Sequence, residues 1–156
     1  MKKRITAAAG IASAAIVLAV LMLFLGGTGA AQGIHTCSPT DRQFIQVAQL
    51  NMLSFSSTAE DFLHGSGRAS SVIATTETSR SNVEATHPED PSLRKARAVL
   101  AGMFAEYARA VRAKMQQEDP GQHIYSAYSF ANLAHGILAR AQAPLKQRGC
   151  DIAPLL

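Results

Sequence analysis

Three stretches of the chain carry apolar residues at alternating spacings of three and four, the pattern of a helix that buries one face in a bundle. The first run comprises Ile45, Ala48, Met52, Phe55, Ala59 and Phe62. The second comprises Leu93, Ala96, Leu100, Met103, Tyr107 and Ala110, with Lys114 at the next position of the same spacing. The third comprises Ile124, Ala127, Ala131, Ala134, Leu138, Ala141 and Leu145. No segment longer than four residues has the pattern of a strand. The sequence therefore predicts an all-α fold.

Residues with strong preferences for helix ends mark where the predicted helices begin and stop. Ser38-Pro39 and Asp90-Pro91 each place a capping side chain before a proline, which is favoured at helix N-termini. Gly65 suits a left-handed cap after the first run. The Asp-Pro-Gly sequence at 119–121 separates the second run from the third. These signals predict two helical hairpins.

Two regions depart from this pattern. Residues 68–86 are rich in Ser and Thr, which compete for backbone hydrogen bonds and lower helix propensity. Their apolar stripe is thin, and it comprises Ala69, Val72 or Ile73, Thr76 and Val83. We still expect a helix there, because strand alternation is missing. Pro144 is expected to kink or end the last helix, with Gly149 as its terminator.

The chain contains two cysteines, and the predicted topology brings them together. Four helices joined by short connections favour an up-down-up-down bundle, in which the first helix starts at the end where the fourth finishes. Cys37 precedes the first helix and Cys150 follows the fourth. We therefore predict a Cys37–Cys150 disulfide. By loop-closure entropy, a loop of this length contributes about 4–5 kcal/mol to stability.

Residues 1–31 have the layout of a secretory signal, with Lys2, Lys3 and Arg4 before an uncharged segment at 5–25 and small residues after it. Cleavage is expected after Ala30 or Ala31. Alternatively, residues 5–25 stay as a membrane anchor, since 21 residues can span about 30 Å of hydrocarbon. Either way, a short linker at 32–37 precedes a domain at 38–156 that is predicted to be extracytoplasmic, either secreted, periplasmic or anchored.

The charges argue against a nucleic-acid partner. The whole chain has a net charge of +4, but residues 32–156 carry 12 basic and 11 acidic residues. Their distribution is uneven, with −4 over residues 32–90 and +5 over residues 91–156. This asymmetry either steers a charged partner or lets the two helical hairpins dock through complementary rims.

Three residues with soft or borderline donor atoms are predicted at one level of the bundle. At 1.5 Å per residue, Met52 lies about 20 Å along the first helix and Met103 about 18 Å along the third. His135 lies about 20 Å from the end of the fourth helix. Methionine and histidine bind haem iron and copper, and bundle cores hold such sites. Met52, Met103 and His135 are therefore candidate cofactor ligands. The alternative is that methionine fills the core and the histidine is a boundary residue, with no cofactor.

The two ends of the domain resemble small secreted haem-binding helical proteins, which bracket a helical domain with two cysteines. Ala143-Pro144-Leu145 before Cys150 is similar to their Pro-Leu element, and Phe62-Leu63-His64 is similar to an aromatic-Leu element near a histidine. The chain lacks the His-Pro that follows that element, and its middle is longer. The resemblance covers only the two ends and implies haem as a ligand.

Common catalytic signatures, such as the His-Glu-x-x-His zinc motif and the nucleophile elbow, do not occur in the sequence. Binding is therefore favoured over catalysis. The first functional hypothesis is an exported binding protein or accessory subunit for a protein, cell-envelope or membrane-associated partner. The alternative is binding of haem, a metal or a small apolar ligand in the bundle core. Five aromatic residues either form a partner-binding face or fill the core, namely Phe104, Tyr107, Tyr125, Tyr128 and Phe130.

Overall fold

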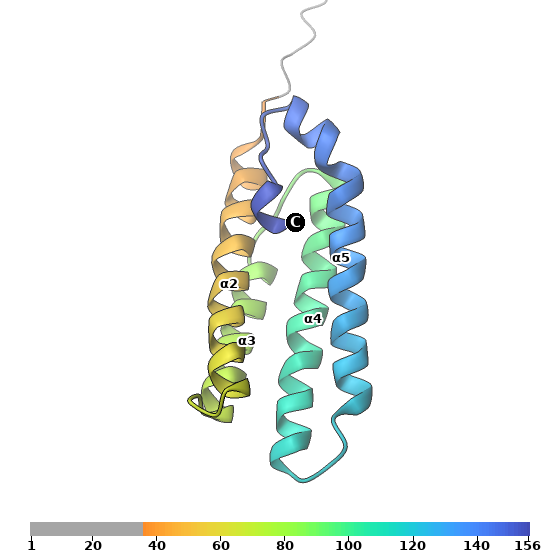
Figure 1. Ribbon diagram of the computed structural model, residues 1–156. Helices are drawn as coiled ribbons and strands as arrows, with labels where there is room; N and C mark the ends of the chain where they lie inside the picture. The colour runs from red at the N-terminus through yellow and green to blue at the C-terminus, as the bar shows by residue number, and fades with distance from the viewer. Residues whose placement is uncertain (1–35) are drawn as a thin grey trace, which may run out of the picture. The chain divides into compact units, whose positions relative to one another are not determined.

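The computed structural model describes residues 36–156, which are all-helical (Figure 1). Helix α2 spans Pro39–Leu63, α3 spans Ala69–Glu84, α4 spans Pro91–Met115 and α5 spans Gly121–Gln147. A short 3₁₀ helix, η1, spans Ala153–Leu155. The prediction of a helical bundle with four helices is confirmed, and no strand occurs within the described residues.

The two predicted helix starts are confirmed, because the capping side chains form the expected hydrogen bonds. The Ser38 hydroxyl accepts the backbone N–H of Asp41 at 3.1 Å, and Pro39 occupies the first turn of α2. The Asp90 carboxylate accepts the N–H groups of Ser92 at 2.7 Å and Leu93 at 3.2 Å. Both side chains satisfy amide groups that have no partner within the helix, so each fixes the residue where its helix begins.

Helix α3 is continuous despite its Ser and Thr content. Its buried residues are Val72, Thr76, Ser79 and Val83. The Thr76 hydroxyl lies 2.8 Å from the carbonyl oxygen of Val72 and 2.9 Å from that of Ile73. Because the hydroxyl donates within its own helix, Thr76 is buried without losing a hydrogen bond. This explains how a polar sequence supplies a core-facing helix.

Helix α5 continues through Pro144 to Gln147. Proline has no N–H to donate to the preceding turn, which weakens the helix locally. Figure 1 shows the last turns of α5 bending toward α2. Of the two outcomes expected for Pro144, the helix therefore bends and does not end there.

Each helix packs against the next helix along the chain, but α2 and α5 do not meet. Helix α3 contacts α2 and α4, and α4 contacts α5. Between the two fully described helices α2 and α5, no pair of Cα atoms lies within 8 Å. Instead, η1 contacts both of them, as Figure 1 shows. The bundle therefore has an open side between α2 and α5, where a closed four-helix bundle would have a fourth interface.

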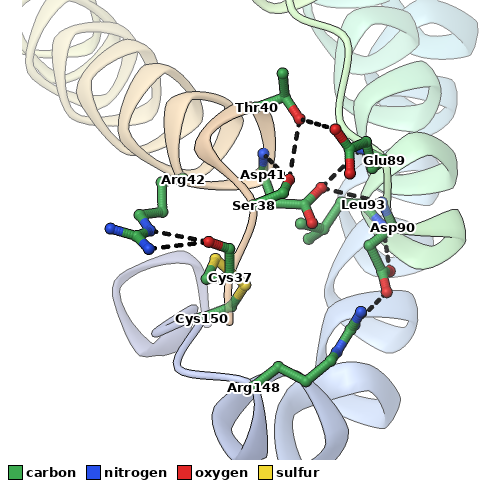
Figure 2. Close-up of a disulfide and its surroundings, with 10 residues drawn as sticks. All are labelled: Cys37, Ser38, Thr40, Asp41, Arg42, Glu89, Asp90, Leu93, Arg148 and Cys150. Atoms are coloured by element: carbon green, nitrogen blue, oxygen red, sulfur yellow. Dashed lines mark hydrogen bonds and ion pairs between the residues drawn. A yellow bond between two sulfur atoms is a disulfide. The ribbon is translucent and has the colours of Figure 1, made fainter. Parts of the chain in front are cut away.

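The predicted disulfide closes one end of the bundle. The sulfur atoms of Cys37 and Cys150 are 2.00 Å apart and their Cα atoms are 4.9 Å apart. Gly149 has a φ of 75°, and the N–H of Cys150 donates to the carbonyl of Leu145 at 2.9 Å. This left-handed helix end turns the chain toward Cys37. In Figure 2, the Arg42 guanidinium donates to the Cys37 carbonyl at 3.0 and 3.2 Å.

The predicted signal or anchor at residues 1–31 lies outside the described residues, as does most of the linker. The described part of the chain has no helix that is both long enough and apolar enough to cross a membrane.

Candidate functional site

A pocket of about 190 Å³ lies on the open side of the bundle. Three helices and the C-terminal residues contribute its lining, which comprises Met52, Leu100, Met103, Ala131, Ala134, His135, Leu138, Leu155 and Leu156. His135 has the single polar side chain in this set. An apolar cavity of about 150 Å³ in another protein binds benzene. The pocket therefore has the size and chemistry to hold a small apolar molecule.

All three candidate ligands lie on the wall of this pocket, each from a different helix. Met52 comes from α2 and is half-buried, whereas Met103 comes from α4 and is 4% exposed. His135 comes from α5 and is exposed, so it lies at the rim. The structure thus brings together the three residues that sequence spacing placed at one level. Their role as ligands stays a prediction.

Small side chains on α5 leave the room for the pocket. Ala131 and Ala134 lie on the same side of the helix as Leu138, because residues three and four apart share a helix face. Larger residues at these two positions would reach across the space toward Met52. The separation of α2 from α5 therefore leaves a pocket that neither helix fills.

An aromatic cluster adjoins the methionines one helical turn away. The Phe55 ring meets the Tyr107 ring edge to face, with centroids 4.7 Å apart, and the Phe104 ring in the same way at 5.6 Å. Phe55 is three residues after Met52, and Tyr107 is four residues after Met103. Burial raises the pKa of the Tyr107 hydroxyl. Apolar side chains therefore continue along α2 and α4 from the level of the pocket.

The larger grooves on the described surface are more polar. The groove between α3 and α4 measures about 340 Å³ and is lined by Arg80, Glu84, Arg97 and Arg109 among small residues. These charges are largely paired within the protein, since Arg80 binds Glu84 and Arg109 binds Glu106. Such paired charges are already satisfied, so this groove is a weaker candidate than the apolar pocket.

Charges also join the two helical hairpins. The Arg112 guanidinium on α4 pairs with the Glu77 carboxylate on α3, and Arg148 after α5 pairs with Asp90 before α4. Both pairs link the acidic half of the domain, residues 32–90, to the basic half, residues 91–156. They therefore support the interpretation that the uneven charges help the two halves to dock.

The five candidate aromatic residues divide between core and surface. Phe104 is fully buried, and Phe130 and Tyr107 are half-buried. Tyr125 and Tyr128 are 73% and 66% exposed, and the neighbouring Ile124 is 51% exposed. The core interpretation therefore holds for three of the residues, whereas the two tyrosines on the first half of α5 are available to a partner.

Sequence reasoning missed the part that the C-terminus plays in the pocket. Leu155 and Leu156 line it, and Ile152 just before them is buried. The signal was present, because three large apolar residues follow Cys150 in a six-residue tail. The sequence does not show the path of the tail, however, so it does not indicate that these residues lie near Met52 or His135.

In residues 36–156, no three His, Cys, Asp or Glu side chains group together in a way that would hold a metal ion. Comparisons of the chain with protein-family models, curated proteins and solved structures gave no match.

Proposed function

We propose that residues 38–156 form an extracytoplasmic binding domain that takes up a small apolar ligand between α2, α4 and α5. The observation that carries this proposal is the composition of the pocket, in which His135 is the one polar side chain among nine lining residues. Apolar pockets with few polar groups are the usual form of small-molecule sites. The tail residues Leu155 and Leu156 would cover the bound ligand.

Two features support an extracytoplasmic location. Residues 1–31 have the charge and hydropathy pattern of a signal peptide or an anchor, with membrane contact through residues 5–25 if they are retained. The Cys37–Cys150 disulfide belongs to the kind that persists in oxidising compartments. Sequencing the N-terminus of the mature protein distinguishes a cleaved signal peptide from a retained anchor. Cleavage exposes Ala31 or Gln32 as the first residue, whereas anchorage leaves residues 1–31 in place.

The size of the pocket favours a ligand smaller than haem. Haem b has roughly forty non-hydrogen atoms, and ligand pockets of about 300–1,000 Å³ are typical for molecules of that size. A pocket of about 190 Å³ takes haem only if the tail moves away. Haem titration of the protein tests this alternative, since axial ligation by His135 predicts a Soret shift that is lost in His135→Ala.

Indole is a suitable probe for the proposed site, because its nine non-hydrogen atoms suit a pocket of this size. We expect indole to perturb the NMR amide signals of Met103, Ala134 and Leu138 in the full chain. Ala131→Leu fills the pocket and should weaken indole binding at least tenfold. Ala139→Leu is the matched control, because Ala139 is an exposed alanine of α5 outside the pocket. Equal indole binding by the two variants would overturn the proposal.

Partner binding is the second candidate function, and the exposed side chains of Ile124, Tyr125 and Tyr128 favour it. Tyrosine contributes strongly to protein interfaces because it is large and partly apolar. An envelope protein or a membrane-associated partner is the expected binding class. If the surface around Tyr125 and Tyr128 binds such a partner, the partner copurifies with the protein from the native membrane or secreted fraction. Tyr125→Ser combined with Tyr128→Ser then abolishes this copurification. Leu53→Ser on α2 is the control and leaves it intact.

A further inference from the structure

The pocket contains a donor set that defines a more specific ligand. Met52, Met103 and His135 contribute two thioether sulfurs and one imidazole, each from a different helix. The rest of the lining comprises the side chains of Leu and Ala residues. A sphere of about 190 Å³ is about 7 Å across, so the three donors can share one ion only when their side chains turn into the pocket. Methionine has three rotatable side-chain bonds, so its sulfur can adjust to a site of this size.

These donors match the preference of one metal ion in particular. Thioether sulfur is a soft ligand that selects Cu(I), and imidazole binds copper readily, whereas Mg²⁺ and Ca²⁺ prefer oxygen donors. With a neutral imidazole, all three donors are uncharged. The complex would thus carry a single positive charge, which is the least costly charge for a cation in an apolar pocket.

The burial of the three residues provides an entry path. His135 is exposed at the rim, Met52 is half-buried and Met103 is buried on the inner wall. A Cu(I) ion can therefore meet the imidazole first and then the two sulfurs. We propose that this pocket binds one Cu(I) ion through Met52, Met103 and His135. The inference shares its pocket with the proposed function but assigns a different class of ligand to it, so the two are tested separately.

The test is a Cu(I) titration of the full chain under anaerobic conditions, with a reductant that keeps copper as Cu(I) but leaves the Cys37–Cys150 disulfide intact, and with bicinchoninate as the competing coloured chelator. We expect one Cu(I) per chain. Met52→Leu, Met103→Leu and His135→Gln should each weaken binding about tenfold or more. Leucine conserves volume and apolarity, so the methionine variants are expected to fold. Met115→Leu is the matched control, because Met115 is 58% exposed on α4 and lies outside the pocket.

Indole binding separates failure of this inference from failure of the proposed function. The methionine-to-leucine variants keep the pocket apolar, so they should bind indole as the unchanged protein does. Cu(I) affinity that is undetectable, or equal in these variants and Met115→Leu, would overturn the copper site. If indole still binds under that outcome, the proposed function stands. If the unchanged protein does not bind indole, the apolar-ligand function is overturned. The Cu(I) titration then decides separately whether the copper site exists.

Discussion

At the scale of single residues, two aspartates connect three helices at the disulfide end. The buried Asp41 carboxylate on α2 accepts the backbone N–H groups of Glu89 at 2.8 Å and Asp90 at 3.0 Å. The Asp90 carboxylate in turn caps α4 and pairs with the Arg148 guanidinium after α5 (Figure 2). Asp41 also lies in the first turn of α2, where the helix dipole favours a negative charge. The structure adds its contact with a loop 48 residues away.

The protonation of Asp90 links this network to pH. Burial raises the pKa of Asp90, but the Arg148 hydrogen bond and the N–H groups of Leu93 and Ser92 outweigh burial, so its pKa lies below the ordinary 3.8. A lowered folded-state pKa means that the carboxylate contributes its full stability above about pH 3.8. That contribution is lost as the pH falls through the folded-state pKa.

Asp90→Asn tests this contribution, because asparagine can still cap the helix but carries no charge for Arg148. At pH 7 we expect the free energy of unfolding to fall by about 1.5–3 kcal/mol, the range for hydrogen bonds to charged groups. The deficit should shrink when urea unfolding is repeated below pH 3.8. Asp61→Asn, at an exposed position on α2, should change stability by less than about 0.5 kcal/mol. An equal loss of unfolding free energy at both pH values would contradict the conclusion that the charge of Asp90 provides this stability.

At the scale of elements, α2, α4 and α5 end in the same way. In each helix, the residue after the C-cap has a positive φ, which is 77° at Gly65, 63° at Gln117 and 75° at Gly149. The following N–H then donates back into the helix, as Glu118 does to Ala113 at 2.8 Å. Glycine adopts this conformation without strain, whereas a side chain at this position meets the following carbonyl. Gln117 is therefore the strained member of the three.

The strain at Gln117 predicts a stabilising substitution. Gln117→Gly removes a left-handed penalty of about 1–2 kcal/mol but increases the freedom of the unfolded chain, so we expect a gain of about 0.5–1 kcal/mol. Thermal unfolding measures this as a higher midpoint. Gln116→Gly is the neighbouring control. Its φ is −85°, so the same substitution there relieves no strain and should lower the midpoint. A drop in midpoint for Gln117→Gly would show that this end is not strained.

At the scale of the whole molecule, the disulfide has two structural consequences. It closes a loop between residues separated by 113 positions, and it anchors the tail whose Ile152 is buried and whose Leu155 lines the pocket. On the open side of the bundle, no Cα atoms of α2 and α5 lie within 8 Å of each other. The disulfide and the tail therefore provide the link between the first helix and the last.

Reduction should destabilise the domain strongly. For a loop of this length, the chain-entropy estimate is about 4–5 kcal/mol. We expect a lower urea midpoint for the reduced protein, and the same midpoint for Cys37→Ser combined with Cys150→Ser. Adding reductant to the serine variant is the control and should have no effect. Unchanged midpoints in the reduced protein would mean that the unfolded chain gains little freedom when the bond is broken.

The sequence by itself determined the helix starts at Ser38 and Asp90, the left-handed end at Gly65 and the disulfide partners. It also predicted Gly149 as a helix terminator, but its left-handed conformation came from the structure. Caps and turns depend on hydrogen bonds over a few residues, so local sequence carries them. The pairing of Cys37 with Cys150 needed only an even number of short-connected helices. The common level of Met52, Met103 and His135 followed in the same way, since helix rise is constant.

Only the tertiary structure decided how these helices sit around one another. It decided that α2 and α5 stay apart, that Leu155 and Leu156 line the pocket between them, and that Tyr125 and Tyr128 remain exposed. It also decided that Asp41 binds the loop before α4. These features depend on helix rotation and on the path of the tail. Both are set by many weak contacts between residues far apart in the chain, and no local pattern in the sequence records their sum.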